Sequence, residues 1–356
     1  MAYRVIQWAT GGVGRAAIQA VGDHPELELV GCWVHSPEKV GRDAGEICGG
    51  VPLGVTATHD RESLLALEAD CVVYSPVMAD PSELMAILAS GKNVVTPLGW
   101  VYPFRSHDVS ELEAACHKGG ATLHGTGIHP GGITERFPLM VSALSHAITH
   151  VRAEEFSDIR SYGTAWVVGE MMLFGKTPGQ AQASPMVKLL GGGFMQSIDM
   201  IADTLGMRLD PEKRVRHEMA VATAPIDSPI GPIQPGHVAA QRFTWQGLVA
   251  GEPVITVRVN WLMGQENLDP PWGFGPGGER FEVEVTGDPP VHLSFHGLHP
   301  SSIEQGLVRN PGIVATANHC VSAIPYVCAA EPGLRSYLEL PLIAGRAAPA
   351  LRDRSA

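Results

Sequence analysis

The residues best suited to chemistry lie in a glycine-rich turn near the N-terminus. An apolar stretch ends at Trp8, the pattern A-x-G-x-x-G follows at residues 9–14, and small residues lead away from it. In a strand–turn–helix unit, such glycines let the backbone approach a pyrophosphate, and the helix N-terminus offers it unpaired N–H groups. The pattern predicts a dinucleotide site; a tight turn that binds nothing is the alternative. The expected cofactor-binding residues of this turn are Thr10, Gly11, Gly12, Val13 and Gly14.

The residues after the second expected strand, 28–35, indicate which dinucleotide binds. A site for NAD usually places Asp or Glu here, against the ribose 2′-hydroxyl. This chain has His35 and Ser36, with Lys39 and Arg42 downstream. Donors and cations without an acid favour a 2′-phosphate, so we expect these residues to bind NADP rather than NAD. The alternative is that Lys39 and Arg42 belong to a solvated loop.

Three more strand ends should contribute to the same site. Strands are expected at 69–76, 92–97 and 121–127. Because open parallel sheets bind ligands at the carboxyl ends of their strands, residues at these ends are expected to contact the cofactor. They are Ser75, Pro76, Thr96 and Gly127.

Hydride transfer also requires a group that protonates or polarises the substrate. His129, in the loop after the last of these strands, could donate to a carbonyl oxygen, and Tyr102 could act as a phenolic acid. Glu170 lies in an apolar segment, where burial would raise its pKa and make it an acid–base group. The alternatives are a loop hydrogen bond for His129, aromatic packing for Tyr102 and a surface salt bridge for Glu170. An apolar substrate pocket is expected around Trp100, Tyr162 and Trp166.

Composition limits the class of protein. The formal net charge of -12 argues against nucleic acid or an anionic membrane as a partner, and no apolar run reaches the length of a membrane span. The chain enters a strand without a signal peptide, and its six cysteines form no C-x-x-C pair, so we expect free thiols in the cytoplasm. On a strand His292 and His296 would be about 13 Å apart. His299 lies past a glycine. No metal site is therefore expected.

The elements that hold these residues fall into two parts of an α/β protein. Up to about residue 130, strands alternate with helices at 60–67, 80–90 and 109–118, which predicts a Rossmann-type, doubly wound parallel sheet. We expect residues 1–130 to form a dinucleotide-binding domain, completed by a C-terminal helix within about 311–345. Residues 131–310 should form a substrate and dimerisation domain.

The second domain is expected to be α+β, with a mainly antiparallel sheet. Glu282 and Glu284 alternate with Val283 and Val285, which indicates a sheet with one wet face. An apolar sheet favours a homodimer. The loop 264–279 would cover a pocket or join the dimer interface. Helices are expected at 134–146, 164–175, 178–206 and 314–330, and strands at 150–156, 215–222, 237–245, 253–261, 280–286 and 291–296.

Several of these features together resemble a known group. The fingerprint, the order of the strand ends, the G-x-H-P-G loop at 127–131 and the tail from Thr316 to Pro341 resemble proteins with a dihydrodipicolinate-reductase-type N-terminal domain. Within that group the chain is most similar to 2,4-diaminopentanoate dehydrogenases and native amine dehydrogenases, over nearly its whole length. The resemblance implies a Rossmann domain that binds NAD(P)H and a dimer-forming second domain that covers the substrate. It also implies reversible deamination of an amine or reductive amination of a carbonyl compound.

The chain departs from this group at a residue on which the amine chemistry depends. Members with amine dehydrogenase activity carry a glutamate in a segment like T-C-E-E-L-x-Y-P, whereas residues 96–103 read T-P-L-G-W-V-Y-P and place Leu98 and Gly99 at the acidic positions. His129 also stands where the group commonly has Asn, and the H-H-x-x-K segment of dihydrodipicolinate reductases is absent. We expect an NAD(P)H-dependent oxidoreductase for a small or medium apolar amine, imine or carbonyl compound. A carbonyl reductase without amine chemistry and a cofactor-binding protein without turnover are the alternatives.

Overall fold

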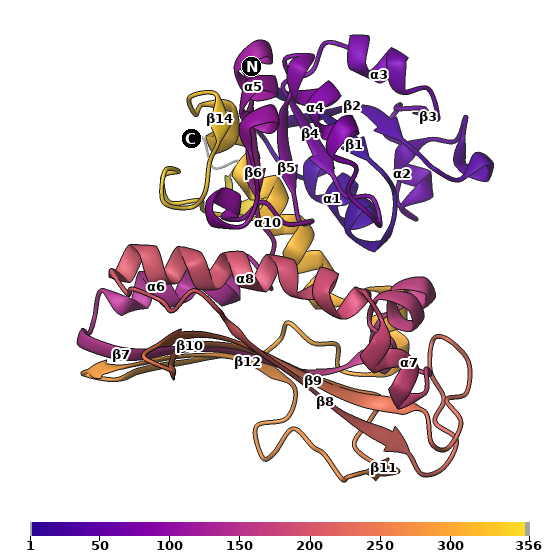
Figure 1. Cartoon of the computed structure of the whole chain (residues 1–356). Coiled ribbons are helices and arrows are strands. Elements are labelled where there is room, and N and C mark those ends of the chain that lie inside the picture. The colour runs from indigo at the N-terminus through magenta and orange to yellow at the C-terminus, as the bar shows by residue number, and fades with distance from the viewer. Residues whose placement is uncertain (1, 353–356) are drawn as a thin grey trace. The chain divides into compact units, whose positions relative to one another are not determined.

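The computed structural model describes residues 2–352 and divides the chain into two compact units. Unit 1 comprises residues 1–128 and 313–356, and unit 2 comprises residues 129–312. Figure 1 labels elements of both units where there is room.

Unit 1 is built on a seven-stranded sheet in which the described strands pair in parallel. The spatial order is β14-β6-β5-β4-β1-β2-β3, the order of a doubly wound sheet extended at one edge. The predicted Rossmann-type fold is therefore confirmed. Its strands are β1 (Tyr3–Trp8), β2 (Leu27–Trp33), β3 (Ala57–Thr58), β4 (Cys71–Tyr74), β5 (Asn93–Thr96), β6 (Thr122–Gly125) and β14 (Gly333–Leu334).

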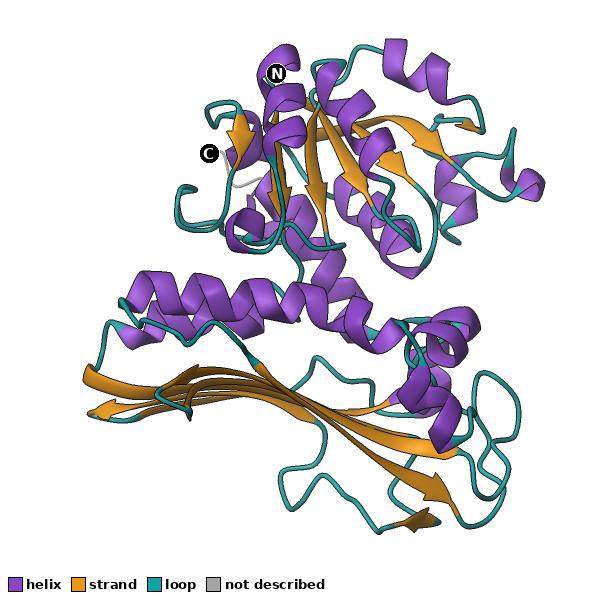
Figure 2. Cartoon of the chain, in the orientation of Figure 1, coloured by secondary structure: helices purple, strands orange, loops and turns teal. Residues whose placement is uncertain are grey.

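Helices cover both faces of this sheet (Figure 2). Successive residues of a strand point to opposite faces, so Val73 of β4 packs in one core with Ile18 and Ile324, while Val72 packs in another with Ile87. The helices are α1 (Gly12–Gly22), α2 (Ala44–Ile47), α3 (Arg61–Ala66), α4 (Pro81–Ala89), α5 (Ser110–Gly119), α10 (Pro311–Cys328) and α11 (Pro349–Arg352), with short 3-10 turns η1 (Pro37–Lys39) and η2 (Pro103–Arg105).

Unit 2 contains a second seven-stranded sheet, of order β11-β8-β9-β10-β7-β12-β13. Its strands pair antiparallel except β7 with β10, which run parallel. This confirms the mainly antiparallel second sheet. The strands are β7 (His146–Asp158), β8 (Arg214–Ala222), β9 (Val238–Val249), β10 (Glu252–Leu262), β11 (Leu268–Asp269), β12 (Arg280–Asp288) and β13 (Val291–Phe295).

The two faces of this second sheet differ in chemistry. Helices α6 and α8 lie along one face (Figure 1), where Phe243 and Val257 join the core. On the other face Arg152 pairs with Glu282 and Glu284, so the alternation predicted for β12 is observed as an ion-pair network. The helical elements of unit 2 are the π-helices η3 (Gly132–Arg136) and η5 (Val167–Met171), the 3-10 turn η4 (Ile159–Ser161), and helices α6 (Phe137–Ser142), α7 (Pro178–Ala183), α8 (Met186–Leu205) and α9 (Ile303–Val308).

Three helix predictions for this unit were wrong in extent. The helix expected at 134–146 is a π-turn followed by α6, and β7 already begins at His146. The helix expected at 178–206 is broken because Ser184 precedes Pro185 and is extended, with ψ 132°. The helix expected at 164–175 ends early, before Leu173, whose φ is +64°.

Candidate cofactor and catalytic site

The turn after β1 combines a left-handed residue, Ala9, with a close backbone approach at Gly14. Ala9 takes a left-handed φ of +73°, the conformation that the usual first glycine would supply. A Cβ on Gly14 would lie 2.1 Å from the Ala9 carbonyl oxygen, so the helix packs against the turn only because Gly14 has no side chain. The buried Gln7 amide donates to the same oxygen at 2.8 Å and to Ser75 Oγ at 2.9 Å, which joins the ends of β1 and β4.

Helix α1 begins at this turn with space at its N-terminus. Gly11 occupies the N-cap, and within the described residues no side chain caps the helix. A Cβ on Gly11 would meet no described atom within 4 Å. A pyrophosphate accepts hydrogen bonds from such free first-turn N–H groups. The turn formed by residues 10–14 therefore fits a dinucleotide.

A cation from the loop after β2 reaches the same turn. Lys39 Nζ donates to the Thr10 carbonyl oxygen at 3.3 Å and to Thr10 Oγ1 at 3.2 Å. Across the described part of the chain, no ion pair joins Lys39 to a carboxylate. Asp43 is occupied by its own loop, because its carboxylate accepts backbone N–H groups including that of Leu53, which lower its pKa.

His35 and Ser36 follow β2 after one further residue and lie close to Lys39 in sequence. His35 is exposed, and its ring meets the Trp33 ring edge-on at 6.2 Å. Ser36 is half-buried and precedes the turn η1, to which Lys39 belongs. The predicted site residues of the first and second strand ends thus lie on segments joined by the Lys39–Thr10 contact.

The other predicted strand ends lie at the same carboxyl edge of the sheet. Thr96 is buried, and its carbonyl oxygen accepts the Thr126 N–H at 2.8 Å, beside Gly127. Pro76, half-buried, follows Ser75. The structure thus brings the turn and the ends of β4, β5 and β6 to one edge.

The segment that departs from the family pattern crosses the end of β6. A Cβ on Gly125 would lie 2.1 Å from the Gly99 carbonyl oxygen, so this segment passes directly over the strand. Leu98 and Trp100 pack against the core around α4 and α5. Tyr102 is half-buried, with its ring edge-on to Phe104 at 5.2 Å.

The sequence did not single out a polar cluster next to Gly127. His319 of α10 contacts the Gly127 carbonyl oxygen and lies 3.3 Å from Thr126 Oγ1. The Tyr337 hydroxyl bonds Thr126 and lies 3.3 Å from His319 Nδ1. His319 and Tyr337 lie about 190 to 210 residues after Thr126 and Gly127. No motif spacing could therefore predict that they meet. The only signal was a histidine within an otherwise apolar helix.

The predicted acid His129 lies inside unit 2. Its side chain is 3% exposed, and its ring packs between Phe194 and Phe281, at 5.0 and 5.5 Å. In the described residues neither ring nitrogen has a hydrogen-bond partner. The alternative for His129, a hydrogen bond to the loop backbone, is therefore not observed. Burial lowers the pKa of His129 to about 3, which leaves the ring neutral at physiological pH.

A buried carboxyl group faces this histidine. Glu155 Oε2 of β7 lies 3.6 Å from His129 Nε2, and Ser157 Oγ donates to Glu155 Oε1 at 2.6 Å. Ser157 in turn lies 2.8 Å from His299 Nε2. Burial raises the pKa of Glu155 to about 7, although the Ser157 bond opposes the change. The signal in the sequence was the pair Glu154-Glu155, because adjacent residues of a strand face opposite sides and one of the two had to face the core.

Tyr162, Trp166 and Glu170 occupy different environments. Tyr162 packs against the core of unit 2, and burial together with the Glu155 charge raises its pKa. Trp166 is 48% exposed. The Glu170 side chain is 53% exposed and pairs with Lys176 Nζ at 2.6 Å. The expectation that burial tunes Glu170 was therefore wrong, and the surface salt bridge weighed against it is what the structure contains.

Hydrogen bonds and ring contacts within unit 2 hold the loop 264–279 in place. The Gln265 side-chain oxygen accepts the Phe274 N–H at 2.8 Å, and Arg280 donates to the Phe274 carbonyl oxygen at 2.8 Å. The Phe274 side chain is buried, and Arg242 stacks on Trp272 at 4.8 Å. Residues of this loop also line a pocket of about 710 Å³ together with Arg160 and α9.

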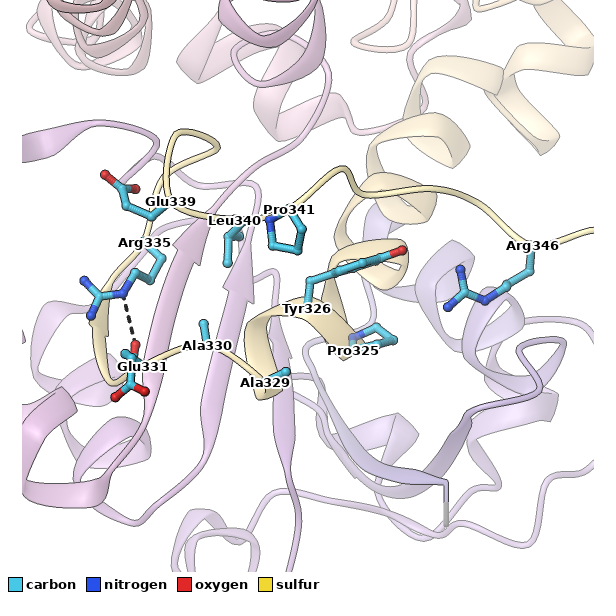
Figure 3. A pocket seen from close by; sticks show the side chains of 10 residues that line it. All are labelled: Pro325, Tyr326, Ala329, Ala330, Glu331, Arg335, Glu339, Leu340, Pro341 and Arg346. Atoms are coloured by element: carbon cyan, nitrogen blue, oxygen red, sulfur yellow. Dashed lines mark hydrogen bonds between the residues drawn. The ribbon is translucent and has the colours of Figure 1, made fainter.

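A second pocket, of about 580 Å³, lies in unit 1 at the end of α10 (Figure 3). Tyr326, Leu340 and Pro341 form part of its wall. The neighbouring Glu331 carbonyl oxygen accepts from Thr122, the first residue of β6. The pocket therefore lies at the amino ends of the strands, on the opposite edge from the glycine turn. It does not belong to the dinucleotide site.

Within residues 2–352, no group of three or more His, Cys, Asp or Glu side chains could hold a metal ion. In the same described part of the chain, none of the helices has the length and apolarity needed to cross a bilayer.

Comparison with known proteins places this geometry in a family. The model of the dihydrodipicolinate reductase N-terminus matches residues 5–97, and that of the 2,4-diaminopentanoate dehydrogenase C-terminal domain matches residues 133–352. An amine dehydrogenase of Streptomyces virginiae is 34% identical over 95% of this chain and 96% of its own. The 2,4-diaminopentanoate dehydrogenase of Acetoanaerobium sticklandii is 27% identical over 65% of this chain and 61% of its own.

A solved structure agrees at the level of the fold. The amine dehydrogenase of Mycobacterium smegmatis superposes with a TM-score of 0.78, at 24% identity, over 97% of each chain. The fold, the glycine turn and these matches define an NAD(P)-dependent oxidoreductase. The chain belongs to the 2,4-diaminopentanoate dehydrogenase family, with an N-terminal part of the dihydrodipicolinate reductase type.

Proposed function

We propose that the protein transfers a hydride between NADP and a small or medium, mostly apolar amine, imine or carbonyl compound. The observation that carries the proposal is the glycine turn after β1, with an uncapped helix N-terminus within the described residues and Lys39 bonded to it. The N-terminal domain, 1–130 with the C-terminal helix, binds the cofactor. The domain 131–310 carries the substrate residues and the dimer interface. The nicotinamide cofactor supplies or accepts the hydride when it is bound.

The proposed cofactor contacts follow from the strand ends. The turn N–H groups bind the pyrophosphate, and Ser75, Pro76, Thr96 and Gly127 line the nicotinamide end. His35, Ser36 and Lys39 bind the 2′-phosphate. Two observations support NADP over NAD: the absence of an acid at residues 33–36, and the engagement of Asp43 with its own loop.

The substrate side is apolar in this proposal. Trp100, Tyr162 and Trp166 shape the substrate pocket, and Leu98 and Gly99 place no carboxylate there. The pocket also has no evident group to bind the carboxylate of an amino-acid substrate. A monofunctional amine or ketone therefore suits it better than an amino acid. Because the family glutamate is missing, carbonyl reduction without ammonia is the second candidate activity.

The protein is a homodimer in a reducing compartment in this proposal. The second sheet offers an extended face for a homodimer. The six cysteines are free thiols, which suits a reducing compartment such as the cytoplasm.

One assay separates the candidate activities. NADPH oxidation is followed at 340 nm with a panel of aliphatic ketones and aldehydes, with and without ammonium. A rate that requires ammonium supports amine chemistry, and a rate without it supports carbonyl reduction. Tight NADPH binding with no turnover across the panel would replace both with a cofactor-binding protein.

A further inference from the structure

One strand of unit 2 gathers buried polar groups that the glycine turn does not explain. Glu155 and Ser157 are two residues apart on β7, so both point to the same face of the sheet. There the carboxyl group of Glu155 lies between His129 Nε2, at 3.6 Å, and Ser157 Oγ, at 2.6 Å. His299 holds Ser157 at 2.8 Å and stacks on Phe281. This cluster is costly to bury, so a use for it is expected.

The cluster also contains buried polar atoms without a hydrogen-bond partner among the described residues. Both nitrogens of the His129 ring lack a hydrogen-bond partner among the described residues, although the side chain is 3% exposed. Buried polar atoms are nearly always paired, and an unpaired one points to a ligand or a catalytic task. The Glu155 side chain is 13% exposed, so it is less deeply buried than that of His129.

We propose that Glu155 is the catalytic residue that exchanges a proton with the substrate, and that Ser157 positions its carboxyl group beside His129. The proposal deepens the function above and rests on it. It gives the chain a carboxyl group in place of the one missing at Leu98 and Gly99. Ser157 donates to Oε1, Oε2 lies 3.6 Å from His129 Nε2, and Trp261 also hydrogen-bonds this carboxyl group.

The position along the chain suits this task. A single residue, Ile128, separates His129 from Gly127, which lies just beyond the end of β6 at the carboxyl edge of the cofactor-binding sheet. Of the residues of unit 2, those around His129 are therefore among the nearest to the dinucleotide site along the chain. Glu155 contacts this first residue of unit 2, with 3.6 Å between its Oε2 and His129 Nε2.

The proton balance is simple. In carbonyl reduction the substrate carbon gains the hydride and its oxygen gains the proton of the Glu155 carboxyl group, so that C=O becomes H–C–O–H. Glu155 is left as a carboxylate and regains a proton from water. In amine oxidation the Glu155 carboxylate takes a proton from the substrate ammonium, which frees the nitrogen lone pair that drives hydride loss and forms the iminium.

The electrostatics of the cluster suit a group that works in both protonation states. Burial raises the pKa of Glu155 to about 7, and the charge of Glu279 acts in the same direction. His129 stays neutral because burial lowers its pKa to about 3, and burial with the charge of His296 lowers that of His299 to about 4. Tyr162 is also protonated, since its pKa is raised. Glu155 is thus the member of the cluster that titrates near neutral pH, where a general acid–base group is most effective.

The test compares two buried carboxyl groups. Glu135 is fully buried and its pKa is also raised to about 7, but its contacts are with the Gly131 N–H and Ser197 rather than with His129. Glu155→Gln should lower the maximal rate roughly 100- to 10,000-fold, the usual range for a lost acid–base group. Glu135→Gln should retain the wild-type rate.

Readouts other than the rate separate catalysis from structure. The wild-type rate of carbonyl reduction should fall above about pH 7. That dependence should vanish in Glu155→Gln and persist in Glu135→Gln. In Ser157→Ala it should move to higher pH, because the lost bond had lowered the pKa of Glu155. Formate should partly restore amine oxidation by Glu155→Ala, because near neutral pH formate is a carboxylate and replaces the missing proton acceptor.

The outcomes are distinguishable. NADPH affinity and thermal midpoint are measured for every variant, so a misfolded variant is recognised directly. An active wild-type enzyme whose pH dependence survives Glu155→Gln, without formate rescue of Glu155→Ala, overturns the role of Glu155 and leaves the proposed function intact. A wild-type protein that binds NADPH without turning over any substrate defeats the proposed function itself.

Discussion

Lys39 offers the sharpest test of the proposed cofactor preference. Its Nζ lies 3.3 and 3.2 Å from the carbonyl and hydroxyl oxygens of Thr10, on the turn that is expected to bind the pyrophosphate. Lys39→Met keeps the apolar stem and removes the charge. Losing the bonds to Thr10 affects both cofactors and costs about 1 kcal/mol, or roughly five-fold in affinity.

The effect on NADP should be larger because its 2′-phosphate is charged. A hydrogen bond to a charged group contributes about 1.5–3 kcal/mol, so NADP should lose a further 10- to 150-fold or so. The difference should shrink at high salt, which screens half-exposed charges.

Calorimetric titration of both cofactors at low and high salt measures these effects. Lys118→Met, at an exposed position near the end of α5, is the matched control and should change neither affinity. An equal loss for NAD and NADP, or no loss for either, would refute the assignment of Lys39 to the 2′-phosphate.

Three further predictions follow from buried or exposed contacts. Gly14→Ala would place a methyl group 2.1 Å from the Ala9 carbonyl oxygen, so it should lower the thermal midpoint and abolish cofactor binding in a dye-based melting assay. Lys213→Met should destabilise the protein by about 3 kcal/mol in urea unfolding, because Lys213 Nζ pairs at 2.7 Å with Asp199, whose side chain is 3% exposed. Glu170→Gln should leave kcat unchanged and shift stability by less than about 1 kcal/mol, since its ion pair is on the surface.

Each of these has a contrasting control. Gly11→Ala, where the added methyl group meets no described atom within 4 Å, should keep the wild-type midpoint and weaken only cofactor binding. Lys188→Met removes an exposed lysine of the same unit and should not change the urea midpoint. A tenfold fall in kcat for Glu170→Gln would show that Glu170 contributes to catalysis and would contradict this prediction.

The local elements of unit 1 could be predicted because their signals are local. Asp60 and Asp80 precede helices, and their carboxylates accept N–H groups of the first turn as N-caps do. The strands are apolar on both faces, as in a covered parallel sheet. The helix boundaries in unit 2 failed where Pro185 and the left-handed Leu173 interrupt apolar periodicity.

The catalytic side chains were harder to anticipate because tertiary burial decides them. Glu170 looked buried from its apolar neighbours, yet its side chain is 53% exposed and paired with Lys176. The sequence did not reveal Glu155 as a candidate. The burial of its side chain is decided by residues distant in sequence, such as His129 and Trp261. The contact between His319 and Gly127 joins α10 to the end of β6, and local patterns carry no information on such a pairing.

The central claim is that the turn at residues 10–14 holds a dinucleotide. Its most direct test is calorimetric titration of the full chain with NADPH, side by side with Gly11→Ala. We expect one saturable site per chain, tighter for NADPH than for NADH, and a marked loss of affinity in the Gly11→Ala variant, which should still melt like the wild type. No binding of either cofactor to the wild type, or binding that Gly11→Ala leaves untouched, would contradict it.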